Sequence, residues 1–169
     1  MTAQHSIAID IARESPLWQR LPDADALVER AVSAAVTVGG LAHAPGAELS
    51  VVLTDDAGIR KLNAAWRAKD KPTNVLSFPA AAAPMIARSP MLGDIILAFE
   101  TVDREAAEAR QPPADHFVHL VVHGFLHLFG YDHQDDAEAD AMEALETEIL
   151  AELGIPDPYA EALALRAAG

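Results

Sequence analysis

Cysteine is absent from the 169-residue sequence. Its absence excludes disulfide bonds and thiolate-bound metals, so a tight transition-metal site has to be built from histidine and carboxylate side chains. A chain without cysteine also suits a reducing cytosol. The sequence therefore directs the search for a metal site to its seven histidines.

Long apolar runs are absent as well. No segment has the roughly 18 uninterrupted apolar residues of a membrane-spanning helix. The first residues, MTAQHSIAIDIARESPLW, lack the basic flank and apolar run of a signal peptide. We therefore expect a cytoplasmic protein without a membrane partner. Because 51% of the residues are hydrophobic, the chain can bury a core, and its length favours a single domain over residues 1–169.

Basic residues are scarce, with 12 Lys and Arg against 26 Asp and Glu, which gives a formal net charge of −14. This excess argues against indiscriminate binding to nucleic acid, because phosphate contacts need basic side chains. Residues 132–152 hold nine carboxylates and no Lys or Arg. Five of the twelve basic residues fall within residues 60–71: Arg60, Lys61, Arg67, Lys69 and Lys71. These residues either line a path for RNA, with Trp66 as a stacking surface, or form a solvated surface. The helical spacing of Trp66 favours a place in the core.

Hydrophobic periodicity predicts about four strands and five helices. The strands are expected near residues 6–12, 47–55, 74–79 and 92–99, and the helices near 23–36, 55–68, 100–110, 116–129 and 135–154. The Ala-rich segment 80–90 is expected to be an exposed, mobile loop. Strands with helices both between and after them predict an α+β domain with one small mixed sheet.

Four histidines form one stripe on the expected helix 116–129: His116, His119, His123 and His127. They cannot all bind one ion, since His119 and His127 lie roughly 12 Å apart along a helix. Gly130 can take a positive φ and turn the chain, so that His133 comes back beside His123 and His127. We therefore predict one metal ion on His123, His127 and His133, with a fourth position open to water. His116 and His119 are expected to have no metal role.

The pattern HxxxHxxGxxH is shared with the metzincin zinc proteases, which carry glutamate directly after the first histidine. Here that position is Gly124. Glycine cannot take a proton from the attacking water, and cleavage of an amide also needs a proton delivered to a poor leaving group. Cleavage of a phosphodiester mainly needs charge stabilisation, which a metal and an arginine supply. Gly124 thus disfavours a protease and leaves a phosphoesterase open.

Five segments of the sequence together resemble the bacterial YbeY family of endoribonucleases and ribosomal RNA maturation factors. They are HGFLHLFGYDH, RKLNAAWRAKDKPTNVLSFP, LGDI, MEALE and DPY, within residues 50–159. The resemblance implies a zincin-like (metalloprotease-like) core and one Zn²⁺ per chain on His123, His127 and His133. It also implies single-strand-specific RNA cleavage in 16S rRNA 3′-end maturation and late ribosome quality control. The implied partners are single-stranded rRNA, the small ribosomal subunit and a ribosomal protein.

The resemblance further matches Arg60 to an arginine in the family's active-site channel, where it would neutralise charge on the phosphate. The alternative is a helix-surface arginine paired with Asp55, Asp56 or Asn63. Some family members carry Asp where this chain has Asn74, which weakens any role of this position as a base. Asp132 is expected either to orient an imidazole or to cap the following turn.

Three functions stay open at this point. The first is a zinc-dependent endoribonuclease. The second is a ribosome assembly factor whose zinc is chiefly structural and which has no nuclease activity of its own. The third, a metallopeptidase, is disfavoured by Gly124.

The final acidic helix is expected to close the core through Met142, Leu145, Ile149 and Leu150, with its carboxylates facing water or a basic partner.

Overall fold

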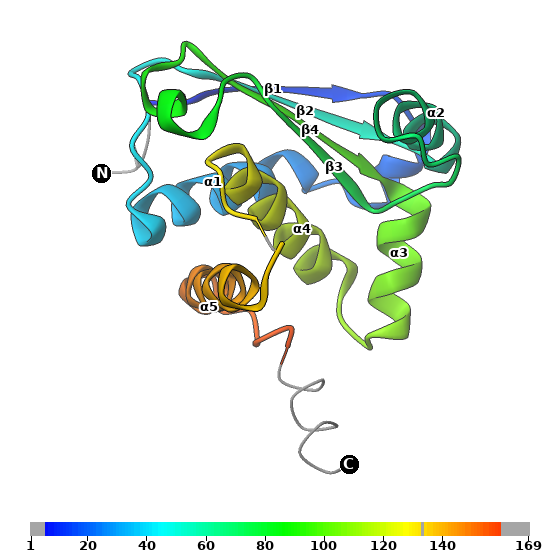
Figure 1. Ribbon diagram of the computed structural model, residues 1–169. Coiled ribbons are helices and arrows are strands. Elements are labelled where there is room, and N and C mark those ends of the chain that lie inside the picture. Colours follow the sequence, from blue (N-terminus) through cyan, green and yellow to red (C-terminus); the bar gives the residue numbers. More distant parts are fainter. Residues whose placement is uncertain (1–5, 133, 160–169) are drawn as a thin grey trace.

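The computed structural model describes residues 6–132 and 134–159 (Figure 1). Its elements follow the predicted order, with short 3₁₀ turns η1 (Pro16–Arg20) and η2 (Ala83–Arg88) in addition. The strands are β1 (Ala8–Arg13), β2 (Glu48–Thr54), β3 (Val75–Pro79) and β4 (Met91–Ala98). The helices are α1 (Ala24–Gly39), α2 (Asp56–Arg67), α3 (Phe99–Glu108), α4 (Pro113–Leu128) and α5 (Asp136–Glu152).

The four strands form one mixed sheet in the order β1-β2-β4-β3. β1, β2 and β4 are parallel, and β3 runs antiparallel to β4 at the edge. Helices α1, α4 and α5 lie below the sheet (Figure 1). Helix α2 packs on the other face, against β4. The prediction of an α+β fold with a small mixed sheet is confirmed.

Helix α4 is the central element of the layer below the sheet. It packs against α1, α3, α5 and β3, and most of its side chains are buried. Proline is favourable in the first turn of a helix, where its missing N–H is not needed, and Pro113 begins α4. The helix ends before Gly130, whose φ of +98° suits glycine and turns the chain as predicted.

Helices cover the two apolar faces of the sheet to different extents. The main core lies between the sheet and α1, α4 and α5, whereas α2 covers a smaller cluster formed around Ile59, Leu76 and Ile96. The segment 80–90, predicted to be an exposed loop, contains η2, which buries Ile86 in the main core. None of the helices in the described part of the chain is long and apolar enough to cross a membrane.

Candidate active site and metal centre

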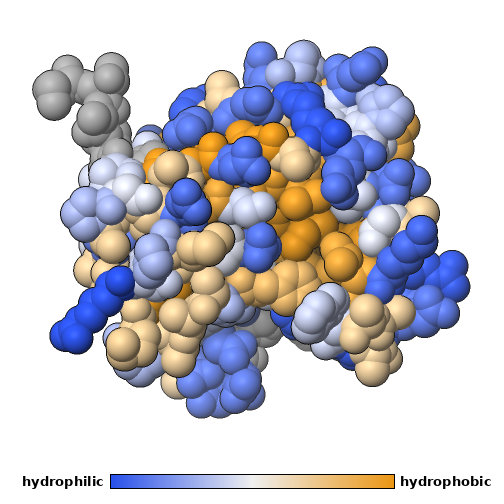
Figure 2. All heavy atoms as spheres, turned by 90° about the horizontal axis from the view of Figure 1, so that it is seen from above, coloured by the Kyte–Doolittle hydropathy of each residue, from blue (hydrophilic) through white to orange (hydrophobic). Residues whose placement is uncertain are grey.

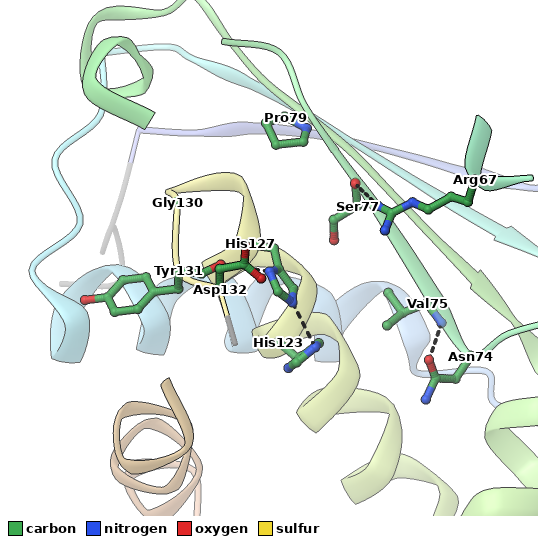
Figure 3. Close-up of a pocket in the computed structure, with 10 residues that line it drawn as sticks. All are labelled: Arg67, Asn74, Val75, Ser77, Pro79, His123, His127, Gly130, Tyr131 and Asp132. Atoms are coloured by element: carbon green, nitrogen blue, oxygen red, sulfur yellow. Dashed lines mark hydrogen bonds between the residues drawn. The ribbon is translucent and has the colours of Figure 1, made fainter. Parts of the chain in front are cut away.

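A hollow of about 550 Å³ opens between α4, the free edge of β3 and the turn that follows α4 (Figure 3). Its lining combines imidazole, guanidinium, carboxamide and carboxylate groups with a few apolar side chains. The lining residues are Arg67, Asn74, Val75, Ser77, Pro79, His123, His127, Gly130, Tyr131 and Asp132. Two of the three predicted metal ligands thus share one hollow.

His123 and His127 point their Nε2 atoms at each other across 3.0 Å (Figure 3). On the far side of each ring, Nδ1 meets a group that can only accept a hydrogen bond. These acceptors are the Glu146 carboxylate at 2.9 Å from His123 and the Tyr131 carbonyl at 2.8 Å from His127. Each Nδ1 therefore carries a proton, and in the neutral form of such an imidazole the lone pair lies on Nε2.

Two lone pairs that face each other at this distance repel unless a cation or a proton lies beside both. Imidazoles held through Nδ1 by a carboxylate or a backbone carbonyl are the usual ligands of zinc in proteins. The donor set of His123 and His127 therefore fits a metal ion. The third predicted ligand, His133, lies outside the described residues, and within residues 6–132 and 134–159 no group of three metal-binding side chains occurs.

Glu146 is the buried partner that holds His123. It lies on α5, has no exposed surface, and accepts hydrogen bonds from His119 Nε2 at 2.6 Å, His123 Nδ1 at 2.9 Å and the Tyr159 hydroxyl at 2.7 Å. Burial alone would raise the pKa of Glu146, but the hydrogen bonds from His119 and His123 outweigh it and hold the pKa at about 2. Burial and the neighbouring carboxylate raise the pKa of Tyr159, so its hydroxyl stays protonated and donates.

Glu146 was not among the predicted site residues, because the carboxylates of the last helix were expected to face water or a basic partner. A signal was present: Glu146 follows Met142 by four residues and precedes Ile149 by three, so it lies on the apolar face of α5. A carboxylate on such a face is costly to bury unless it is hydrogen-bonded.

Gly124 allows α4 to pack directly against β3. A Cβ atom at this position would lie 2.9 Å from Ser77 Oγ, 3.1 Å from Ile95 Cγ2 and 3.3 Å from Val75 Cγ2. The Ser77 hydroxyl also donates to the Gly124 carbonyl at 2.9 Å. A glutamate side chain, as in the metzincins, has no room here.

The structure does not bring Arg60 to the histidines. Its guanidinium lies at the surface and pairs with Asp70, with Nε–Oδ1 and Nη2–Oδ2 distances of 2.7 and 3.2 Å. Arg67 lines the hollow instead, and it donates to the Ser77 carbonyl at 3.1 Å. The two arginines are seven positions apart, which is about 10.5 Å along a helix. Arg67 lies in the last turn of α2, where it reaches Ser77 of β3. The structure thus places Arg67, and not Arg60, at the hollow, and the role of Arg60 on the phosphate stays a prediction.

The other two polar residues singled out in the sequence, Asn74 and Asp132, both line the hollow. Asn74 accepts from the Val75 N–H at 2.6 Å and donates to Glu105 at 3.0 Å, so its carboxamide is held in place. His116 bonds to the same Glu105 carboxylate at 2.9 Å. His116 and His119 thus both bind carboxylates and are mostly buried, and neither lines the hollow.

Comparisons with known proteins agree with the resemblance drawn from the sequence. The model of the family described as Endoribonuclease YbeY matches residues 16–154. A protein named Endoribonuclease YbeY from Bradyrhizobium sp. (strain BTAi1) is 58% identical over 85% of this chain and 87% of its own length. A protein of the same name from Methylocella silvestris is 53% identical over 92% of this chain and 88% of its own length. Another, from Bradyrhizobium diazoefficiens, is 56% identical over 85% of this chain and 80% of its own length. This chain therefore belongs to the YbeY family of endoribonucleases.

Proposed function

We propose that this protein is a zinc-dependent endoribonuclease that cleaves single-stranded RNA in the hollow between α4 and β3. The observation that carries the proposal is the pair of Nε2 atoms of His123 and His127, which lie 3.0 Å apart while each Nδ1 meets a hydrogen-bond acceptor. Three relatives more than half identical to this chain bear the name of an endoribonuclease, which supports the same activity here.

His123, His127 and His133 would hold the zinc ion. When bound, zinc supplies Lewis-acid chemistry, which activates an oxygen nucleophile and polarises a phosphoryl oxygen. Glu146 and the Tyr131 carbonyl keep both Nδ1 atoms protonated, so that the histidines offer Nε2 to the ion. Three protein ligands would leave a fourth coordination position for water or substrate, as in catalytic sites.

Arg67 is the cation best placed to act on the phosphate. Its guanidinium lines the same hollow as His123 and His127 and is anchored by the Ser77 carbonyl. A guanidinium held in this way neutralises the charge that develops on phosphoryl oxygens, without having to reorganise during the reaction. Cleavage of a phosphodiester depends more on this charge stabilisation than on a general base, and Gly124 cannot act as a base.

The proposed substrate is the 3′ end of 16S rRNA in the small ribosomal subunit, during maturation and late quality control in the cytoplasm. The cations on and after α2 would hold the strand, while the large acidic excess of the chain suits contact with a basic ribosomal protein. The same acidic excess favours a second candidate function, a ribosome assembly factor with structural zinc and no nuclease activity of its own.

A pre-small-subunit particle with 3′-extended rRNA separates the two functions. Zinc-loaded protein and the His123→Ala and Arg67→Ala variants, purified identically, are incubated with the particle, and the RNA 3′ ends are sequenced. New ends produced only by the unmodified protein are the expected result. Equal cleavage by all three preparations would reveal a contaminating nuclease, and no cleavage by any of them would favour the assembly factor.

A further inference from the structure

Trp66 is not a core residue, although its helical spacing predicted one. Its exposed fraction is 71%, against 53% for Met85 and 48% for Met91, the other large hydrophobic side chains exposed in the described part of the chain. Trp66 lies near the end of α2, on the face of the sheet opposite the histidines. Seen from above, that face carries an apolar area in its middle, bordered by hydrophilic residues (Figure 2).

A second hollow, of about 480 Å³, opens beside Trp66 on this face. It is lined by Glu14, Val52, Leu62, Trp66, Phe78, Asp94 and Ile96. Side chains along a strand alternate between the two faces of a sheet. In β3, Val75, Ser77 and Pro79 therefore face the histidine hollow, whereas Phe78 faces the second hollow. The two hollows lie on opposite sides of one edge strand.

Arg67 connects the two hollows. It lines the histidine hollow, and its guanidinium carbon also lies 5.8 Å from the centre of the Phe78 ring. The Phe78 and Trp66 rings are neighbours, with centroids 6.1 Å apart. If an RNA phosphate were bound at Arg67, the base of an adjoining nucleotide would therefore lie within reach of both aromatic rings.

We propose that Trp66 and Phe78 form a stacking site for an unpaired base of the RNA strand whose phosphate lies at Arg67. The inference rests on the proposed function and adds a binding subsite to it. Stacking on aromatic rings beside a positively charged path is how proteins hold single-stranded RNA. Lys61, Lys69 and Lys71 are exposed on and after α2, and supply that charge on an otherwise acidic chain.

The charges around the second hollow favour a base in it rather than a phosphate. Glu14 and Asp94 are among the residues that line the hollow. Their negative charges repel phosphate and favour an RNA backbone that runs past Arg67 and the lysines instead. Carboxylates accept hydrogen bonds from exocyclic amines such as N4 of cytosine. The site should therefore bind cytosine more tightly than uracil, which has no amine and a ring of similar size.

The two tryptophans of the chain make the stacking site directly measurable. Trp18 is fully buried and donates to the Thr54 carbonyl at 2.7 Å, so a ligand at the surface does not reach it. A 2′-O-methylated oligocytidylate of about ten nucleotides is titrated into the zinc-loaded protein. Tryptophan fluorescence and the anisotropy of a labelled oligonucleotide are recorded together. We expect saturable quenching that is absent in Trp66→Phe.

Affinity supplies the second readout. Trp66→Ala should weaken binding of the oligocytidylate by about fivefold or more, and Trp66→Phe should keep most of the affinity. Met91→Ala removes another exposed apolar side chain that lines neither hollow, and should bind as the unmodified protein does. Oligouridylate should bind more weakly than oligocytidylate, and equal affinities would overturn the assignment of the carboxylates.

The outcomes separate the stacking site from the proposed function. The stacking site is overturned if the oligonucleotide does not bind at all. It is also overturned if the oligonucleotide binds without quenching and binds Trp66→Ala equally well. In both cases, cleavage of rRNA still decides the function. If Trp66 is quenched but RNA is never cleaved, the stacking site stands and the nuclease does not. Quenching by a ribosomal protein and not by RNA would make this face a protein interface and overturn the proposal.

Discussion

His123 donates its Nδ1 proton to Glu146 across 2.9 Å, and the carboxylate that receives it is fully buried. The same carboxylate also binds His119 and Tyr159, so it is fixed from three sides. The ring of His123 is thereby held in one tautomer and one orientation before a metal arrives. Holding a histidine ligand in its binding orientation in this way strengthens metal binding.

Glu146→Gln should weaken zinc binding by about 10- to 100-fold, because the neutral amide no longer supports His123 as a strong ligand. The dissociation constant is measured by competition with a chromophoric chelator. Glu148→Gln, an exposed carboxylate two residues further along α5, is the matched control and should bind zinc normally. Equal zinc affinity of the Glu146 variant and the control would show that Glu146 only supports the fold.

Gly124→Ala should destabilise the protein by about 1–3 kcal/mol, because the added methyl group meets Ser77, Ile95 and Val75. The sign of the change in unfolding free energy is informative, since replacing Gly by Ala in an unconstrained helix stabilises the helix by up to about 1 kcal/mol. The free energy of unfolding in urea is the measurement. In a double-mutant cycle, Ser77→Ala should relieve part of the cost, and a stabilising Gly124→Ala would refute the close packing of α4 on β3.

Arg67 and Arg60 form a natural comparison, because both lie on α2 and only Arg67 lines the histidine hollow. Arg67→Ala should lower kcat/KM for RNA cleavage by about 100-fold or more, with unchanged zinc content. Arg60→Ala removes an exposed ion pair with Asp70 and should stay within about threefold of the unmodified protein. A large loss for Arg60→Ala and none for Arg67→Ala would instead support the prediction that Arg60 acts on the phosphate.

Glu105 should make stability depend on acid. Partial burial raises its pKa, but hydrogen bonds from His116 and Asn74 outweigh it and leave the pKa below the ordinary 4.5. A carboxyl with a lowered pKa stabilises the fold above pH 4.5. This contribution is lost as the pH falls through the pKa of the folded state. Glu105→Gln should therefore cost about 1 kcal/mol at neutral pH, and the difference from the unmodified protein should shrink in acid.

Urea unfolding at about pH 7 and about pH 3 measures this difference. Glu108→Gln, an exposed carboxylate on the same helix, provides the control. A cost for Glu105→Gln that is the same at both pH values would show that its charge does not support His116 and Asn74.

The sequence predicted the order of strands and helices because each depends on a local pattern. The alternation of β1 and the helical spacing of α4 are read within one element. The positive φ of Gly130 was also predicted, and the structure confirms it. The metal ligands His123, His127 and His133, and the single domain over residues 1–169, stay predictions.

What the sequence did not predict depends on how elements pack. Helical spacing alone put Trp66 in the core, but α2 covers only part of the outer sheet face, and its C-terminal end lies at the edge strand. The same packing brings Arg67 rather than Arg60 to the histidine hollow. Glu146 was missed because a buried carboxylate is expected only where partners from another helix are known, and here they come from α4.

The most direct test of the metal centre is a titration of the protein with zinc, followed by NMR of the imidazole nitrogens in ¹⁵N-labelled protein. We expect that, before zinc is added, His123 and His127 carry protons on Nδ1. Zinc should then shift the Nε2 resonances of both rings at one equivalent and leave both Nδ1 atoms protonated. Protons on Nε2 in the zinc-bound protein, or shifts confined to His116 and His119, would contradict it.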